Sequence, residues 1–389
     1  MGIKDLMKYI KKKKPNIIKK VDLQKYKNTR VAVDANLWCY THMSIAQKGV
    51  LNKTDLSTSE PDRNEVFKIL IQMWLDTYLK WGAEDILLIM CFDGSHPAKK
   101  KIAHDKRTEA KNLVKNKITE LEEKLAELDI LEIQQSDLDE LKRAKANLNW
   151  VSKEEFSTFK SILKSYNIPY LTATGQGEKL CTTLVIDGIC SAALGKDADM
   201  LAYGCKSILN NLKLNGYDIN GVSNYSIEEI NLLEILNTLG FNFSTFVDFC
   251  VSLGCDYNSR IKNYGPAKMH KLLTQHGTLE RVRDEAKLNI DCLDADFCRT
   301  EFKYVNSKSI IAEGTYNLVN CDNVNKINKL DSIYKVDENA NLLYQEQEVR
   351  FGLTPYVERL QKMHSNIKLN PIVESLNLVG LPKIVFKKN

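Results

Sequence analysis

Two carboxylates stand two residues apart, Asp197 and Asp199, directly after a run of small and apolar residues at 189–194. We expect that run to be a short buried strand. In open α/β folds, ligands bind outside the carboxyl ends of the strands, so both side chains are expected at that edge of the sheet. Neighbouring carboxylates repel unless a cation lies between them, and oxygen ligands of this kind suit Mg²⁺. An Asp-x-Asp pair also occurs in solvated loops, and by itself it does not decide between the two.

Further acids occupy similar settings elsewhere in the chain. The apolar run that begins at Arg30 reaches Asp34, and the apolar run 86–92 is followed by Asp93. Glu178 stands at the expected start of a helix, and a further helix is expected at 246–257, whose Gly-x-Asp end carries Asp256. Because the carboxyl ends of parallel strands meet at one edge of a sheet, we expect these acids to gather there.

The elements that must position these acids alternate along the chain. Strands are expected at 30–35, 86–92, 168–171, 189–194 and 207–209, and helices at 2–14, 36–46, 65–82, 154–166 and 177–187. This alternation predicts an α/β fold with a mostly parallel sheet flanked by helices. Residues 48–63 are expected to be a loop, the chain from 226 onward to be mainly helical with a final helix at 354–364, and the chain beyond about 322 to be loosely organised.

A charged segment at 105–149 has helical character but few apolar residues. A helix this polar needs a partner or stands over a cleft. We consider two interpretations, a helical cap over the site and a plain coiled-coil contact.

Positive charge is concentrated in two parts of the sequence. The net charge is only +5, but residues 1–30 carry eleven Lys and Arg against two Asp, and residues 99–119 carry eight against two acidic residues. Such patches suggest a polyanionic partner whose phosphates they neutralise. The alternative is a solvated lysine-rich surface.

Several classes of protein are disfavoured by the sequence. No apolar run reaches the roughly 18 residues that cross a bilayer, and the N-terminus has no signal-peptide core, so no membrane partner is expected. The ten cysteines form no C-x-x-C pair, which argues against zinc and for a reducing compartment.

Taken together, the motifs resemble those of the flap endonuclease family of structure-specific 5′ nucleases, over about residues 1–280. The resemblance rests on these segments in this order: Met1-Gly2-Ile3, Val31-Ala32-Val33-Asp34, Phe92-Asp93-Gly94, Gly177-Glu178-x-x-Cys181, Asp197-Ala198-Asp199, Gly254-Cys255-Asp256-Tyr257 and Gly265-Pro266.

The resemblance implies a PIN-like α/β nuclease core that holds two Mg²⁺, which Mn²⁺ is expected to be able to replace. Its metal-binding carboxylates match Asp34, Asp93, Glu178, Asp197, Asp199 and Asp256. One departure concerns the Glu-x-Glu pattern of the family, because Gln176 occupies the first position here. Glutamine still accepts hydrogen bonds but removes one negative charge, so weaker binding of one metal is expected.

The resemblance also implies contacts with DNA. Lys100 and Arg107 match the basic pair that contacts the scissile phosphate, Tyr40 matches an aromatic on which a base stacks, and Gly2 matches the buried N-terminus beside the junction. For each lysine the alternative is simple solubility, and for Tyr40 a core position. A helix–two-turn–helix is implied at 248–276. Its turn is expected to present backbone to a duplex phosphate, with K⁺ bound there, and to include Lys262, Tyr264, Gly265 and Lys268.

From these matches we expect five regions in the chain. They are an N-terminal nuclease region at 1–107, a helical cap or arch at 108–150, an internal nuclease region at 151–240, the helix–two-turn–helix at 241–290, and a C-terminal helical extension and tail at 291–389.

The predicted activity is Mg²⁺-dependent cleavage of 5′ flaps and 5′–3′ exonuclease action on branched or nicked DNA in replication and repair. The alternatives are a dedicated 5′–3′ exonuclease of mismatch repair or recombination, and a catalytically weak DNA-junction binder. No sliding-clamp motif of the form Gln-x-x-apolar-x-x-aromatic-aromatic occurs after residue 340, so dependence on a clamp is doubtful. A monomer is expected, in the nucleus or the cytoplasm, with viral origin and cytoplasmic replication as one option.

Overall fold

The computed structural model describes residues 2–56, 59–94, 101–128, 132–148, 150–217, 223–314 and 350–370. For residues 101–107, 214–217, 223–224 and 313 it describes the backbone only. Lys100 and the tail beyond 370 therefore lie outside the described residues.

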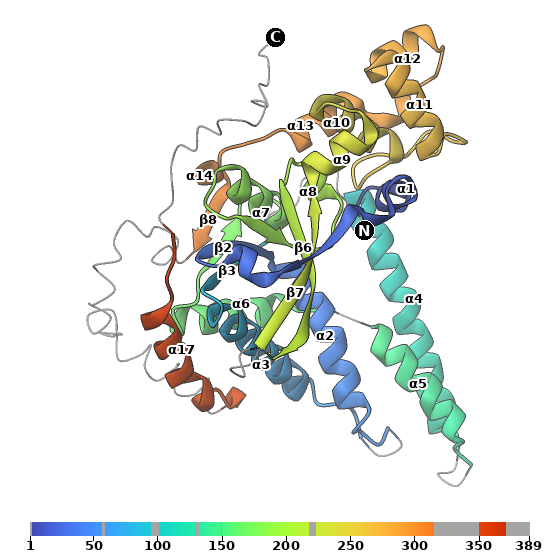
Figure 1. Ribbon diagram of the computed structural model, residues 1–389. Helices are drawn as coiled ribbons and strands as arrows, with labels where there is room; N and C mark the ends of the chain where they lie inside the picture. The colour runs from blue at the N-terminus through green and yellow to red at the C-terminus, as the bar shows by residue number, and fades with distance from the viewer. Residues whose placement is uncertain are drawn as a thin grey trace.

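One mixed sheet of eight strands runs through the molecule in the order β1-β7-β6-β5-β2-β3-β4-β8 (Figure 1). The strands are β1 (Ile18–Asp22), β2 (Thr29–Asp34), β3 (Ile86–Phe92), β4 (Tyr170–Ala173), β5 (Ala192–Leu194), β6 (Ser207–Tyr217), β7 (Ser223–Asn231) and β8 (Ile311–Gly314). The five central strands, from β6 to β4, pair in parallel. This confirms the predicted α/β class with a mainly parallel sheet.

The register of the central strands explains their apolar runs. In β2, Val31 and Val33 belong to the apolar core on one face of the sheet, and Ala32, between them, belongs to the core on the other face. A strand covered on both sides has no polar face, so β3 is buried at all seven positions. Asp34 pairs with Cys91, so the ends of β2 and β3 lie together at the carboxyl edge.

The sequence-based prediction missed three strands, β1, β7 and β8. It expected a mainly helical chain after residue 226, where the end of β7 and the whole of β8 lie. β7 pairs antiparallel with β6 and with β1, and β8 pairs antiparallel with β4. β1 and β8 are short and lie at the two edges of the sheet. An edge strand is paired on one side only and is partly exposed to solvent, so the sequences of these two strands lack a long apolar run.

Helices cover both faces of the sheet. They are α1 (Leu6–Lys13), α2 (Ala35–Leu51), α3 (Arg63–Gly82), α4 (Lys101–Ala126), α5 (Gln135–Asn147), α6 (Lys153–Ser165), α7 (Gly177–Ile186), α8 (Asp199–Ala202), α9 (Leu232–Leu239), α10 (Phe243–Leu253), α11 (Pro266–His276), α12 (Leu279–Glu285), α13 (Ala295–Phe302), α14 (Ser307–Ile310) and α17 (Thr354–Asn366), with short 3-10 turns at Pro15–Ile17, Leu23–Tyr26 and Asp291–Leu293. One apolar core includes side chains of α1 and of α7 to α11, and the other includes side chains of α2, α3, α6 and α17.

Helices α4 and α5 form a hairpin that projects from the body beside α2 (Figure 1). The charged segment 105–149, expected to be helical, thus contributes to two helices. Their contact is a small apolar cluster of Ile118, Leu141 and Ala144, with ion pairs Lys117–Glu140 at 2.8 Å and Lys124–Asp137 at 2.9 Å. An apolar stripe this narrow accounts for the low apolar content of the segment.

The helix at the chain's C-terminal side, α17, packs against α3. Its His364 is buried and lies 2.9 Å from the hydroxyl of Tyr78. Among the described residues, no helix combines the length and the apolar composition needed to cross a membrane.

Candidate active site

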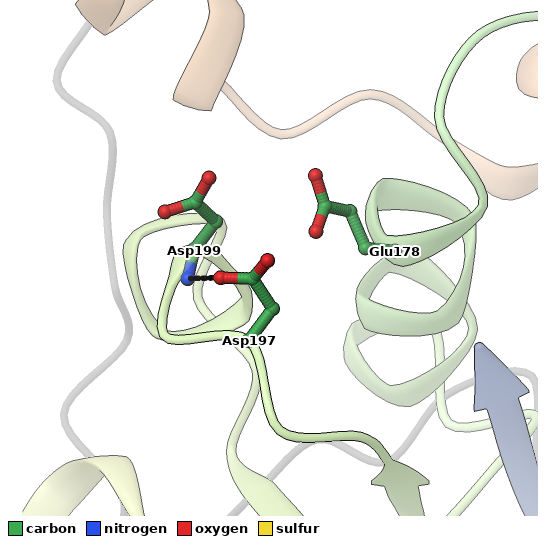
Figure 2. A group of neighbouring side chains, drawn as sticks. All are labelled: Glu178, Asp197 and Asp199. Atoms are coloured by element: carbon green, nitrogen blue, oxygen red, sulfur yellow. Dashed lines mark hydrogen bonds between the residues drawn. The ribbon is translucent and has the colours of Figure 1, made fainter. Parts of the chain in front are cut away.

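Three acids from three neighbouring segments meet at the carboxyl edge of the sheet. Glu178 lies in the first turn of α7, Asp197 in the loop after β5, and Asp199 at the start of α8 (Figure 2). One oxygen of each lies within 4.8 Å of the others. The backbone N–H of Asp199 donates to Asp197 Oδ1 at 3.2 Å, which fixes the pair in one tight turn.

Because these acids are buried, keeping them ionised side by side costs free energy unless a cation is bound. Asp199 is 1% exposed, Glu178 is 8% exposed, and Asp197 is half-buried. Carboxylates withdrawn from water and placed side by side raise one another's free energy, and a divalent cation removes that cost. The donor set consists only of oxygens, as Mg²⁺ and Mn²⁺ prefer, so these residues fit such an ion.

Asp93 connects the end of β3 to the helix start that carries Glu178. Its Oδ1 accepts the backbone N–H of Gly177 at 2.7 Å, and its own N–H donates to Asn36 Oδ1 at 3.1 Å. Asp93 thus lies against the residue that precedes Glu178. A side chain at position 177 would place its Cβ 2.6 Å from the carbonyl oxygen of Cys91, so this close approach needs glycine.

Asp34 ends the adjacent strand and caps α2. It is 7% exposed, and its Oδ1 accepts the N–H of Leu37 at 3.0 Å. The carboxylate therefore stands at the positive end of the helix dipole of α2.

Asp256 follows the end of α10. That helix ends at Leu253 because Gly254 has a φ of +84°, and Asp256 lies half-buried in the turn beyond it, not within the helix expected from the sequence. Within the described residues, the group of acids with ligand atoms inside 4.8 Å contains Glu178, Asp197 and Asp199, and Asp34, Asp93 and Asp256 stand outside it.

Gln176 forms a buried hydrogen-bonded triangle with two tyrosines. Its side-chain oxygen accepts from the Tyr203 hydroxyl at 3.0 Å, its amide nitrogen donates to the Tyr257 hydroxyl, and the two hydroxyls lie 2.9 Å apart. Burial raises the pKa of Tyr203 well above its ordinary value, so it remains a proton donor. The triangle joins the start of α7 to α8 and to the turn of Asp256, and nothing in the sequence indicated it.

Gly2 lies directly on the acids. It has a φ of +82°, and a Cβ added there would be 1.8 Å from Asp197 Oδ1 and 2.8 Å from Asp199 Oδ1. The N–H of Lys4 donates to the carbonyl of Gly254 at 3.1 Å, which holds this segment in place. The structure thus places Gly2 beside the acidic group, and its expected position next to a DNA junction stays a prediction.

The two basic candidates are described only in part. Lys100 lies outside the described residues, and Arg107 is described by its backbone alone, in the second turn of α4. Tyr40 on α2 is half-buried, with its ring edge-on to Phe156 at 6.2 Å and the Lys111 ammonium 5.5 Å from its centre.

The candidate DNA-binding turn lies between α10 and α11. Lys262 is exposed, Tyr264 is half-buried, and Lys268 Nζ donates to the carbonyl of Asn263 at 3.1 Å and lies 5.4 Å from the Tyr264 ring centre. A Cβ at Gly265 would meet no atom within 4 Å, so the backbone before α11 is open to an approaching group.

Comparisons with known proteins bear on this site. The chain matches the XPG N-terminal domain over residues 1–114 and the XPG I-region over residues 167–256. It is 30% identical to Flap endonuclease 1 of Candida glabrata over 72% of this chain and 68% of that protein. It is 25% identical to Flap endonuclease 1 of Cryptosporidium muris over 76% of this chain, and spans 60% of that relative's length.

A solved structure shares the fold. Flap endonuclease-1 from Methanococcus jannaschii superposes with a TM-score of 0.54 at 18% identity, over 94% of this chain and 99% of that one.

Proposed function

Because this chain belongs to the flap endonuclease family, we propose that it hydrolyses phosphodiester bonds of DNA at 5′ flaps, close to the junction of single strand and duplex. A 5′–3′ exonuclease activity at the same site forms part of the proposal. The observation that carries it is the convergence of Glu178, Asp197 and Asp199 at the carboxyl edge of the sheet.

Two Mg²⁺ ions, when bound, would supply the chemistry by activating a water and stabilising the leaving oxygen. Glu178, Asp197 and Asp199 would hold them, together with Asp34, Asp93 and Asp256 from the neighbouring strand ends and turn. Asp93 also keeps Glu178 in place, since it binds the N–H of the preceding residue. In this proposal the carboxylates act as ligands and not as general acids or bases.

Cations would act on the other side of the phosphate. We assign Lys100 and Arg107 to the scissile phosphate, where they would stabilise the charge that develops. Tyr40 would offer its ring to the neighbouring base, which requires that Lys111 give up its present place over the ring. The turn before α11 would contact a duplex phosphate and would bind a K⁺ ion through backbone carbonyl oxygens. It includes Lys262, Tyr264, Gly265 and Lys268.

The hairpin of α4 and α5 is proposed to be the cap through which the 5′ single strand passes. It is anchored at its base by Lys145, which is 6% exposed and pairs with Glu122 at 2.7 Å and with Glu60. The chain is proposed to act as a monomer on branched or nicked DNA, and dependence on a sliding clamp is not proposed.

The test compares two labelled substrates, a 5′ flap whose end is blocked and a duplex with a recessed 5′ end. Cleavage of the blocked flap with Mg²⁺, lost in Asp199→Ala with binding retained, is the expected result. Cleavage of the recessed end alone would favour the dedicated exonuclease. Wild-type protein that binds flaps and never cuts them would refute the enzyme and favour a junction-binding protein.

A further inference from the structure

The first helix presents one face made of lysines. Leu6 and Ile10 of α1, with Ile3 before it, are buried against the body, and Lys4, Lys8, Lys11 and Lys12 are exposed. With 3.6 residues per turn, Lys8, Lys11 and Lys12 share the side of the helix opposite the buried one, and Lys4 lies just before the helix.

The charge of this face is not neutralised by the protein. In the basic N-terminal segment, Lys14 and Lys19 both pair with Glu234 on α9, at 3.6 Å for Lys14. In the described part of the chain, none of the ion pairs uses Lys8, Lys11 or Lys12. Holding adjacent like charges together costs free energy, and such a row is maintained where an anion binds.

The lysine face starts beside the acids and leads away from them. Gly2 lies against Asp197, and α1 then runs alongside α11, with Tyr9 5.7 Å from the ring of His270 and Asp5 paired with Arg260 at 2.9 Å. In Figure 1, α1 lies between the upper end of α4 and the α10–α11 pair.

We propose that the lysine face of α1 (Lys8, Lys11 and Lys12), together with Lys4 just before the helix, binds the phosphates of a DNA duplex that leads away from the cleavage site. Eight helical residues span about 12 Å, and a duplex strand offers one phosphate per about 3.4 Å of axis, so the face covers roughly three phosphates. The proposal rests on the proposed function, because it takes the duplex to be the one contacted by the turn before α11.

A duplex fits this face better than a single strand. Proteins that bind single strands offer aromatic rings on which bases stack. The aromatic residue of α1 is Tyr9, and its ring packs against Phe249 at 5.9 Å and His270, under the Lys13 ammonium. The lysine face therefore offers charge without a stacking surface.

The experiment measures the dissociation constant of the full chain against salt concentration in EDTA, so that no cleavage occurs. The variant is Lys8→Gln/Lys11→Gln/Lys12→Gln. The control is Lys153→Gln/Lys164→Gln/Lys362→Gln, three exposed lysines on α6 and α17. The probes are a plain 30-base-pair duplex and an oligo(dT) strand of about 30 nucleotides.

For the duplex, the slope of log K against log salt should fall in magnitude by about 0.9 for each phosphate that the protein no longer neutralises, hence by roughly 2–3 in the α1 variant. The control variant should keep the wild-type slope, and so should Lys8→Arg/Lys11→Arg/Lys12→Arg, which preserves the charge. An unchanged slope in the glutamine variant would overturn the proposal, as would a change seen with oligo(dT) alone. Because no metal is present, failure of cleavage would refute the proposed function without altering this comparison.

Discussion

The hydroxyl of Tyr203 donates a hydrogen bond of 3.0 Å to the side-chain oxygen of Gln176, two residues before Glu178. The other end of the same amide donates to Tyr257, next to Asp256. Gln176 stands where the family pattern has an acid, and here both ends of its amide are engaged by tyrosines. We conclude that this residue joins the segments that carry the acids, and that it lacks the charge to hold a metal as a carboxylate would.

Replacing Tyr203 by Phe should destabilise the protein. The substitution keeps the ring and leaves a buried oxygen of Gln176 without this donor, a loss worth about 1–3 kcal/mol. The measurement is the free energy of unfolding from urea denaturation in EDTA. Tyr9→Phe is the control, because the hydroxyl of Tyr9 makes no hydrogen bond within the described residues, and a change within about 0.5 kcal/mol is expected. Equal stabilities of Tyr203→Phe and wild type would show that the triangle does not hold these segments.

Gln176→Glu should lower the Mg²⁺ concentration at which flap cleavage is half-maximal, by roughly three- to tenfold, because it adds a negative charge beside the acids. Without metal the same variant should be less stable than wild type, since a further carboxylate is buried next to Glu178. The control is Gln47→Glu, which buries a carboxylate at the base of the α4–α5 hairpin, against Lys145. Gln47→Glu should keep the wild-type Mg²⁺ requirement. If Gln176→Glu kept it too, Gln176 would have no part in the metal site.

Gly2→Ala should reduce cleavage by at least roughly tenfold, because its Cβ would collide with Asp197 and because alanine is strained at a φ of +82°. The matched control is Gly49→Ala on α2, where a Cβ meets no atom within 4 Å and alanine favours the helix by about 1 kcal/mol. The measurement is kcat on a 5′ flap, with thermal unfolding of both variants. Wild-type kcat in Gly2→Ala would mean that the N-terminal segment does not lie on the acids.

Lowering the pH should destabilise the folded protein, because His364 is protonated more readily in the unfolded chain. Burial lowers the pKa of His364 to about 4, against an ordinary value near 6.5 in the unfolded chain. Between these values the unfolded state binds the proton and the folded state does not, so stability is lost as the pH falls from 6.5 to 4. The loss reaches about 2 kcal/mol at pH 5.

His364→Gln can still accept a hydrogen bond from Tyr78, and it removes the titration. Urea denaturation at pH 7 and pH 5 measures the difference, which should be smaller in the variant by about 2 kcal/mol. The same pH dependence in both proteins would contradict the buried neutral histidine.

The central sheet and its acids could be predicted from the sequence for a definite physical reason. Strands β2 and β3 are covered on both faces, so they are continuous apolar runs that end in Asp34 and Asp93. The edge strand β1 and the hairpin strand β7 carry charged and polar residues on their open sides, and their short or mixed patterns do not stand out from loops or helices.

The site itself was predictable only as a set of acids. Spacing along the chain indicates neither that Asp93 binds the N–H of Gly177 nor that Tyr203 and Tyr257 reach Gln176, because these contacts join segments up to 84 residues apart. The one local signal was Gly177, directly before an acid and at a helix start, because a glycine there allows the backbone to pack closely against the end of β3.

The most direct measurement is anomalous diffraction from crystals of the full chain soaked in Mn²⁺, which counts the ions at the carboxyl edge of the sheet. We expect two Mn²⁺ peaks roughly 4 Å apart, both in contact with the group of Glu178, Asp197 and Asp199. An edge without any peak at high Mn²⁺, or peaks that contact none of these three acids, would contradict this expectation.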